Sequence, residues 1–440
     1  MKIQCPVSVK QVAVESGERP KSSSGKGSNG NLLQHLRPLF LVSRLFSLNP
    51  FRIVHKSGKE VQISSTLGIL QCVAACVGYG AFHLYTTYSD DFDTAEKSKN
   101  ATRNATDASD PVQEKSEQNF VSVMIDTYNR YSGLGLYWVL VIGAIGNRRI
   151  LIRFVESLQE VDQIFETKLN VVVNNLHWKR VICIQMTLIF AIIFLFEYFN
   201  CIVYLSDYNP SSVYCMPDCY LVLLTEATAE SQIVGYIKLL QMRFQLINQL
   251  LTREAQNHNR LEIINEIKNL YAHLHLLSLN INKAYGVQLV FILMTLFVTL
   301  TTLMYHCNMK AIRLLLHRPS LDEDLSERYW EVLSTFFWVA LSAYRIFRIC
   351  NICNATKNEA SQIGCLIHGL GMNTNCIRTK TTVKLFSLQL LQQKVEFSAC
   401  GLLAIDHGLV FNIVGAVTTY ILILLQFDVA QNRSQWQRHD

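Results

Sequence analysis

Apolar runs of membrane-spanning length recur along the chain, separated by polar segments. A transmembrane helix needs about 20 predominantly apolar residues. Residues 63–85, 284–309 and 408–427 contain no Asp, Glu, Lys or Arg, and residues 181–205 contain only Glu197. Because the runs are long and the chain has only 8 prolines, the pattern favours helices over a transmembrane barrel.

Three further runs contain ionisable residues, among them Glu226 and Glu230 in the second run and Glu331 in the third. Charged residues inside spans are costly and usually face a cavity or the interior of a helix bundle. We therefore predict an all-α polytopic membrane protein with seven transmembrane helices. The predicted spans are residues 63–85, 120–146, 181–205, 213–236, 284–309, 329–348 and 408–427.

The segment between the fourth and fifth predicted spans has a helical pattern with one apolar face. Its apolar residues recur at steps of three and four, as in an amphipathic helix. The helix could lie along the membrane surface, or the neighbouring spans could extend into a cytosolic bundle. Because the apolar face needs a partner, we predict that helices four to six extend into a cytosolic anchor bundle. The face consists of Leu261, Ile264, Ile267, Leu270, Leu274, Leu277 and Ile281.

Composition agrees with a membrane protein. Half of the residues are hydrophobic and 17% are charged, against about 25% in soluble domains. The polar N-terminal residues 1–30 have no apolar core for a signal peptide, so we expect a disordered cytoplasmic tail. The net charge of +6 does not indicate nucleic-acid binding here.

Motifs of soluble enzymes and metal sites are absent from the sequence. Cys350 and Cys353 form a C-x-x-C pair without a second pair or a histidine partner, which favours cysteines that pack in the core. We expect no enzyme activity, no cofactor and no metal.

The distribution of charge predicts the orientation in the membrane. Nine Lys and Arg residues lie between Lys10 and Lys59, whereas residues 86–119 are acidic and contain glycosylation sequons at Asn100 and Asn104. The positive-inside rule then places the N-terminus in the cytosol and, after seven spans, the C-terminus outside.

The last predicted span has a narrow polar stripe. Asn412, Thr419 and Gln426 repeat every seven residues, and Gly415 and Ile423 lie on the same side of the helix. Such a stripe suits packing against neighbouring helices through small and amide side chains. It equally suits the wall of an ion pore, and periodicity alone does not decide between them.

A second group of residues lies near the predicted outer ends of the helices. Aromatic residues there are typical of a membrane-interface belt. Combined with carboxylates and amides at membrane depth, they can instead line a pocket for a small polar ligand. The candidate pocket residues are Tyr137, Trp138, Glu197, Tyr198, Tyr204, Glu226, His306, Trp330 and Trp338.

The C-terminal sequence resembles the insect gustatory receptors. "TYILILLQF" at 419–427 matches their Thr-Tyr, five hydrophobics, Gln-Phe signature. The preceding "KVEFSACGLLAIDHGLVF" and the N-terminal "LRPLFLVSRLFSLNPFRIV" are also similar to that family. The resemblance extends over most of the chain after Gly30, but it is specific only in these stretches. The N-terminal block and the "KVEF" stretch are most similar to the branch that contains the fructose receptors and the broadly expressed receptors linked to nutrient, bitter, warmth or light responses.

The resemblance implies that residues 31–440 form a ligand-gated, non-selective cation channel of the plasma membrane of sensory neurons. It implies a homotetramer or heterotetramer in the lipid bilayer, opened by a small-molecule tastant such as a sugar. Bitter compounds, amino acids and warmth are alternatives, as is a receptor that needs a partner subunit or signals through a G protein. It also implies pore and gate roles for Gln426, Phe427, Thr419, Tyr420 and Ile423, to which we add Asp428 as an acidic group at the outer mouth.

Overall fold

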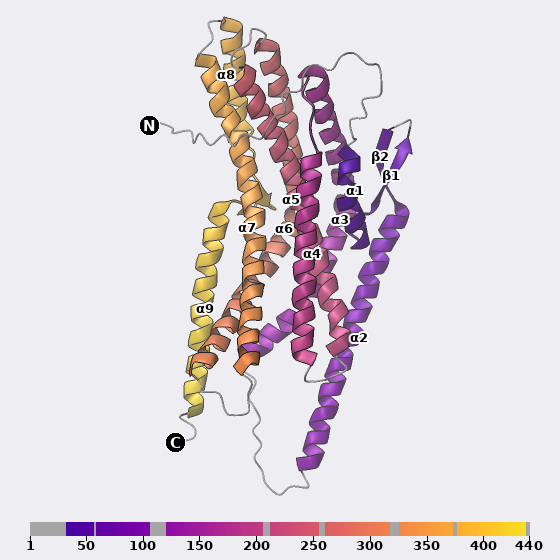
Figure 1. Ribbon diagram of the computed structural model, residues 1–440, viewed down its shortest axis with the longest axis vertical. Coiled ribbons are helices and arrows are strands. Elements are labelled where there is room, and N and C mark those ends of the chain that lie inside the picture. Colours follow the sequence, from indigo (N-terminus) through magenta and orange to yellow (C-terminus); the bar gives the residue numbers. More distant parts are fainter. Residues whose placement is uncertain are drawn as a thin grey trace.

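The chain forms a bundle of long helices (Figure 1). The computed structural model describes residues 32–56, 59–105, 120–205, 212–254, 260–316, 325–372 and 376–436. In these ranges the helices are α1 (Leu32–Leu45), α2 (Thr66–Ala105), α3 (Phe120–Lys168), α4 (Leu176–Leu205), α5 (Ser212–Glu254), α6 (Arg260–Leu316), α7 (Leu325–Met372), α8 (Ile377–Gln392) and α9 (His407–Trp436). Two hairpins, β1 (Phe51–Lys56) with β2 (Lys59–Ser64) and β3 (Ser398–Ala399) with β4 (Leu403–Ala404), complete the fold.

Seven of the helices correspond to the seven predicted spans. The match is close at the start of α3, α5 and α9, whereas Ile63 belongs to strand β2 and α2 begins at Thr66. Five helices in the described residues, α2, α4, α6, α7 and α9, are long and apolar enough to cross a membrane. The most hydrophobic windows of α4 and α9 are largely exposed, as expected for surfaces that face lipid. The all-α prediction is therefore confirmed.

Helix α5 is the core of the bundle, although its described residues are not among the five candidate membrane spans. From Leu224 to Leu251 nearly every residue is buried, and α5 contacts α1, α3, α4, α6 and α7. Its polar residues are tolerated because they contact other helices rather than lipid.

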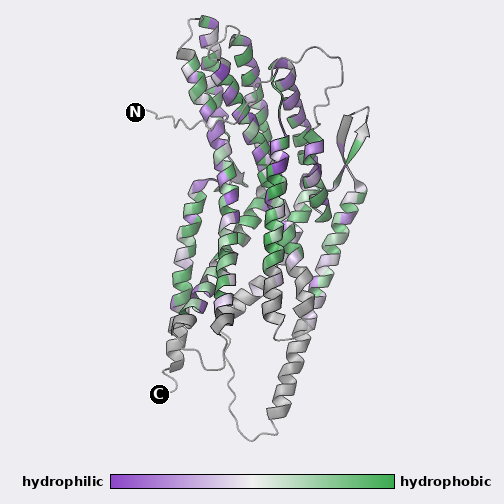
Figure 2. Ribbon diagram, in the orientation of Figure 1, coloured by the Kyte–Doolittle hydropathy of each residue, from purple (hydrophilic) through white to green (hydrophobic). Residues whose placement is uncertain are grey.

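The α8 end of the bundle corresponds to the predicted extension of the fourth to sixth spans, which belong to α5, α6 and α7. The apolar face of α6 is almost completely buried, with Ile267, Leu270 and Leu274 at 0% exposure. Helix α8 contacts α6 and α7 at this end, where hydrophilic residues are more frequent than along α9 (Figure 2). The apolar face is thus covered by protein, and the helix does not lie alone on a membrane surface.

A buried ion pair holds this end together. The Arg243 guanidinium of α5 is fully buried and donates two hydrogen bonds to Asp162 of α3, at 3.0 and 2.7 Å. It also donates to Asn175, which precedes α4, at 2.8 Å. Arg243 therefore links α5 to α3 and to the residue that precedes α4. Its two hydrogen bonds to one carboxylate form the bidentate geometry that favours Arg over Lys.

Two features of the fold differ from the prediction, and one predicted segment lies outside the described residues. The β1–β2 hairpin was not predicted, and α2 continues to Ala105, into the segment 86–119 that was expected to be an acidic loop. The sequons at Asn100 and Asn104 therefore lie near the end of α2. The predicted tail, residues 1–30, lies outside the described residues.

We expect Arg243→Met to lower the free energy of unfolding by about 3 kcal/mol, because it leaves the mostly buried Asp162 carboxylate unpaired. Lys168→Met is the matched control, since Lys168 pairs with Glu266 at 2.8 Å but is 52% exposed, and such pairs contribute less than about 1 kcal/mol. Thermal unfolding of the detergent-solubilised protein measures both variants. Equal destabilisation by the two would contradict this difference.

Candidate functional site

The polar stripe of α9 faces away from the rest of the chain. Helix α9 packs on α6 and α7 through Leu409, Val417 and Ile421, which are at most 8% exposed. The five stripe residues, Asn412, Gly415, Thr419, Ile423 and Gln426, are all exposed. On a helix of 3.6 residues per turn, Val417 and Ile421 lie on the side opposite the stripe, whereas Leu409 lies nearer its edge. The stripe therefore does not pack against the described part of its own chain.

The individual gate candidates differ in their surroundings. The Thr419 hydroxyl donates to the carbonyl of Gly415 at 3.0 Å, one turn earlier in its own helix. The Tyr420 ring lies edge-on to Phe297 of α6, with 6.0 Å between centroids. Phe427 and Asp428 belong to α9, but their side chains lie outside the description, so their gate roles stay predictions.

The β3–β4 hairpin attaches the start of α9 to α6. Asn282 of α6 donates to the Glu396 carbonyl at 2.7 Å and accepts from the Ser398 amide at 3.3 Å. A Cβ at Gly286 of α6 would lie 3.0 Å from the Cys400 nitrogen, so a larger residue there would require the Cys400 backbone to shift. Gly401 has a positive φ of 72°, which glycine adopts without strain.

Side chains of α7 also hold the start of α9. The Asp406 carboxylate accepts from the Gly408 amide at 2.9 Å and lies 3.7 Å from Lys357 of α7. The His407 ring stacks on Phe347 of α7, with centroids 6.1 Å apart. The stretch "KVEFSACGLLAIDHG" is thus the connection that fixes α9 on α6 and α7.

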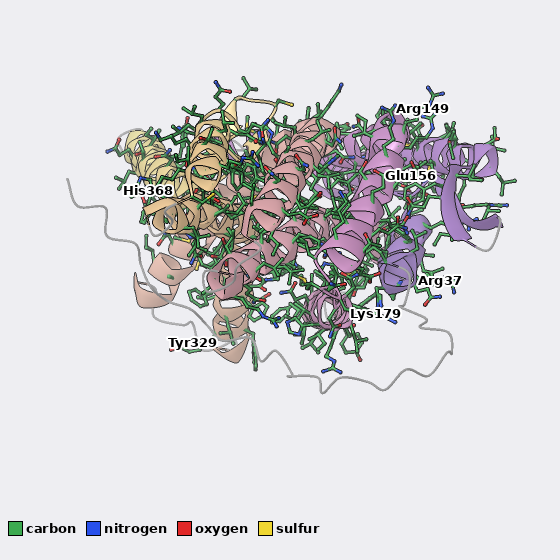
Figure 3. The ribbon with its side chains drawn as sticks, turned by 90° about the horizontal axis from the view of Figure 1, so that it is seen from above. Arg37, Arg149, Glu156, Lys179, Tyr329 and His368 are labelled. Atoms are coloured by element: carbon green, nitrogen blue, oxygen red, sulfur yellow. The ribbon has the colours of Figure 1, made fainter. Side chains whose placement is uncertain are left out.

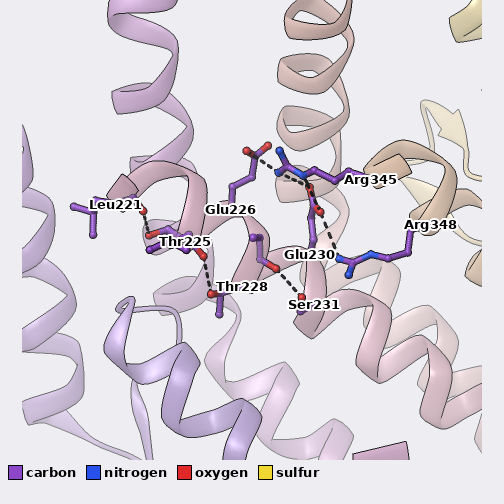
Figure 4. Close-up of polar contacts among 10 residues, drawn as sticks. Leu221, Thr225, Glu226, Thr228, Glu230, Ser231, Arg345 and Arg348 are labelled. Atoms are coloured by element: carbon purple, nitrogen blue, oxygen red, sulfur yellow. Dashed lines mark hydrogen bonds and ion pairs between the residues drawn. The ribbon is translucent and has the colours of Figure 1, made fainter. Parts of the chain in front are cut away.

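A cluster of four charged side chains is buried between α5 and α7 (Figure 4). Arg345 of α7 contacts both glutamates of α5, with Nη2 2.7 Å from Glu226 Oε2 and 2.7 Å from Glu230 Oε1. Its Nε donates to the Glu230 carboxylate as well. Arg348, one turn further along α7, lies 3.5 Å from Glu230 Oε2.

The four charges of this cluster balance. Glu226 and Glu230 lie one turn apart on α5, as Arg345 and Arg348 do on α7, so two carboxylates meet two guanidiniums. All four side chains are at most 7% exposed. Three atoms, Glu226 Oε1 and Arg348 Nε and Nη1, have no hydrogen-bond partner in the described part of the chain. The pairing of Arg345 is therefore much tighter than that of Arg348.

Sequence reasoning selected Glu226 as a pocket residue but missed Arg345 and Arg348. A signal was present, because two arginines three residues apart end an otherwise apolar run and require acidic partners within the membrane. Which helix supplied those partners was not visible in the pattern.

The aromatic pocket candidates do not form one group in the described residues. Tyr137 is buried against Tyr79 of α2, with centroids 4.6 Å apart, and Trp138 donates to the Cys76 carbonyl at 3.2 Å. Trp338 of α7 lies edge-on to Phe196 of α4 at 6.3 Å.

The remaining candidates differ in exposure and in how far they are described. Tyr198 and Trp330 are about 60% exposed, and His306 contacts Tyr305. The side chains of Glu197 and Tyr204 on α4 lie outside the description. Ligand contact by all these residues stays a prediction.

Cys350 and Cys353 follow Arg348 on α7 and are buried in the core, in agreement with a packing role. Within the described ranges, no three His, Cys, Asp or Glu side chains are placed to hold a metal ion.

Comparison with known proteins identifies the family. Residues 107–431 match the family model of the 7tm chemosensory receptors. Among curated Drosophila melanogaster proteins, the chain is 28% identical to gustatory receptor 68a over 207 residues, covering 44% of this chain and 49% of that receptor. It is 28% identical to gustatory receptor 23a over 177 residues (39% and 43%). It is 26% identical to the gustatory receptor for bitter taste 66a over 117 residues (27% and 21%). The chain thus aligns with less than half of the length of these relatives.

Solved structures show the same fold. The insect olfactory receptor OR5 from Machilis hrabei superposes with a TM-score of 0.58 at 10% identity, over 91% of this chain and 99% of that one. Its complex with eugenol superposes with a TM-score of 0.56. At this identity the likeness concerns the fold alone.

We expect Arg345→Met to lower the free energy of unfolding by about 3–5 kcal/mol, because it leaves two buried carboxylates with only Arg348, which lies 3.5 Å from Glu230. Adding Glu226→Gln to Arg345→Met should restore most of that stability, because Glu230 and Arg348 then remain as a balanced pair. Thermal unfolding in detergent measures each variant. A double variant no more stable than Arg345→Met would show that charge balance is not what the cluster provides.

Proposed function

This chain belongs to the 7tm chemosensory receptor family, and we propose that it is a taste receptor that acts as a ligand-gated, non-selective cation channel. The observation that supports a channel is the exposed polar stripe of α9. Asn412, Thr419 and Gln426 would be costly against lipid. They suit a water-filled pore, where amides and hydroxyls can replace part of an ion's hydration shell.

The pore requires more than one copy of the chain. One α9 presents a single stripe, so closed rotational symmetry must bring several stripes around one axis. We propose a tetramer, either of this chain or with related receptors. Gln426 and Phe427 then form the constriction, and Asp428 at the outer mouth raises the local cation concentration.

Opening follows from a difference in ligand affinity between two conformations. A ligand bound among the outer ends of the helices favours the conformation that surrounds it more completely. Its effect reaches α9 through α6 and α7, the two helices on which α9 packs. A differential affinity of about 5 kcal/mol is enough to move the channel from almost always closed to almost always open.

We propose that the ligand is a neutral polar molecule such as a fructose-like sugar. The support is that Arg345 already pairs with Glu226 and Glu230, so these carboxylates are not free to bind a cationic ligand. One relative has bitter taste in its name, and a bitter compound is therefore the second candidate. Calcium imaging of cells that express the chain, challenged with sugars, amino acids and bitter compounds, distinguishes these classes.

The chain crosses the plasma membrane of a sensory neuron with its N-terminus and the α8 end in the cytosol. The basic residues before α2 and the acidic residues towards its end support this orientation. It is the reverse of the orientation of a G-protein-coupled receptor.

Replacing Gln426 with Ala should change the basal cation current or the ion selectivity, because it removes one amide per subunit from the constriction. Phe411→Ala is the matched control on the same helix, since Phe411 is 76% exposed and lies outside the stripe. Whole-cell recording with bi-ionic solutions measures both variants. Unchanged currents in both Gln426→Ala and Phe427→Ala would reject the gate assignment.

The proposed orientation places Asn100 and Asn104 outside the cell, on the side of the membrane that faces the lumen of the endoplasmic reticulum when N-glycans are attached. We expect Asn100→Gln and Asn104→Gln together to abolish the mobility shift that glycosidase treatment produces. Glycosidase resistance of the unchanged chain, combined with labelling of an N-terminal tag on intact cells, would reverse the orientation.

A further inference from the structure

Helix α1 has apolar residues on two sides. Leu33, Leu36 and Leu39 are at most 2% exposed and pack into the bundle, whereas Leu41 and Leu45 are 69% and 74% exposed. Leu41 and Leu45 are four residues apart, so they form one outward face. Helix α1 contacts α4 and α5 on its other side.

The C-terminal end of α1 lies beside the membrane spans. The Cys72 thiol of α2 donates to the Ser47 carbonyl at 3.0 Å, and the Gln71 amide donates to the Arg44 carbonyl at 3.4 Å. Cys72 follows the start of α2 by six residues, or about 9 Å along the helix. Phe46 also contacts Phe190, deep in α4, with ring centroids 6.0 Å apart. The exposed leucines of α1 therefore lie at the depth where α2 and α4 enter lipid.

Basic side chains lie near the middle of α1 and in the first turns of α4. Arg37 is exposed, and Lys179 and Arg180 begin the adjacent helix α4. Trp178 of α4 donates to the Gly235 carbonyl at 2.9 Å, and a Cβ at Gly235 would contact Leu39. These contacts place the first turn of α4 level with the middle of α1. Figure 3 shows Arg37 and Lys179 on the same edge of the molecule, away from Arg149.

The nearby His35 adds no charge to this surface at neutral pH. Partial burial and the neighbouring Lys179 ammonium both lower the pKa of His35. The fixed charges are therefore Arg37, Lys179 and Arg180, one turn of helix above the exposed leucines.

We propose that this face of α1, with the start of α4, binds an anionic phospholipid of the adjacent leaflet. Arg37, Lys179 and Arg180 contact the headgroup, and Leu41 and Leu45 contact the acyl chains. A lipid is the occupant because α1 packs on α4, whose candidate membrane span also exposes apolar residues such as Ile184, which is 52% exposed. A free phosphate ion would leave those leucines uncovered. The site depends on neither the pore nor the tastant.

The test measures binding of fluorescent phosphatidylserine and phosphatidylcholine to the purified full-length chain in an uncharged detergent. We expect the chain to bind phosphatidylserine more tightly. Arg37→Gln, Lys179→Gln and Arg180→Gln should each weaken its affinity for phosphatidylserine about fivefold, with little effect on phosphatidylcholine. The charge-preserving Arg37→Lys, Lys179→Arg and Arg180→Lys combination should retain binding, which separates loss of charge from misfolding.

Two controls define the site further. Lys380 and Lys384 are exposed on α8, far along the chain from α1, and Lys380→Gln with Lys384→Gln should leave binding unchanged. Leu41→Ser with Leu45→Ser should weaken binding of long-chain but not short-chain phosphatidylserine. Equal affinity for the two lipids, a triple Gln variant that binds normally, or displacement of the lipid by inorganic phosphate would each overturn the proposal.

Discussion

The contact of Arg345 with Glu226 and Glu230 is the interaction on which the arrangement of the other helices depends. Separating these charges at membrane depth leaves a buried ion unpaired, at a cost of about 3–5 kcal/mol. Helices α5 and α7 therefore stay joined. Helix α5 is the buried centre of the bundle, and α7 continues from the cluster to Phe347 and Lys357, where it holds the start of α9. Charge pairing in the core thus fixes α7 against α5, and α7 in turn holds the start of α9.

The second constraint is that α9 is held on one side only. Val417 and Ile421 pack on the bundle while Thr419 and Gln426 face outward. Polar groups at membrane depth need water or protein, and this need supports the proposed assembly of several chains around a pore. Because the hairpin with Cys400 and Gly401 fixes only the start of α9 on α6, the far end of the helix is where a ligand-driven change can alter the pore most.

Much of the helical architecture was predictable, because membrane-length apolar runs and the period of the α6 face depend on local sequence. Contacts between distant segments were not. The pairing of Glu230 with Arg345 joins residues 115 positions apart, and nothing in the local pattern selects that partner. Similarly, periodicity revealed the stripe through Gln426 but not which side of α9 meets α6 and α7. The contacts of the aromatic pocket candidates were hidden for the same reason: Tyr137 and Trp338 are each typical of a membrane interface, and their ring partners lie on α2 and α4.

The pore assignment is tested most directly by scanning α9 with cysteine and a charged, thiol-reactive reagent applied from outside during current recording. We expect Thr419→Cys and Gln426→Cys channels to be blocked by the reagent, because both positions lie on the exposed stripe. Val417→Cys channels should not respond, since Val417 packs against the bundle, and the unchanged chain serves as the background. Block at Val417 without block at Thr419 and Gln426 would contradict a pore formed by this face of α9.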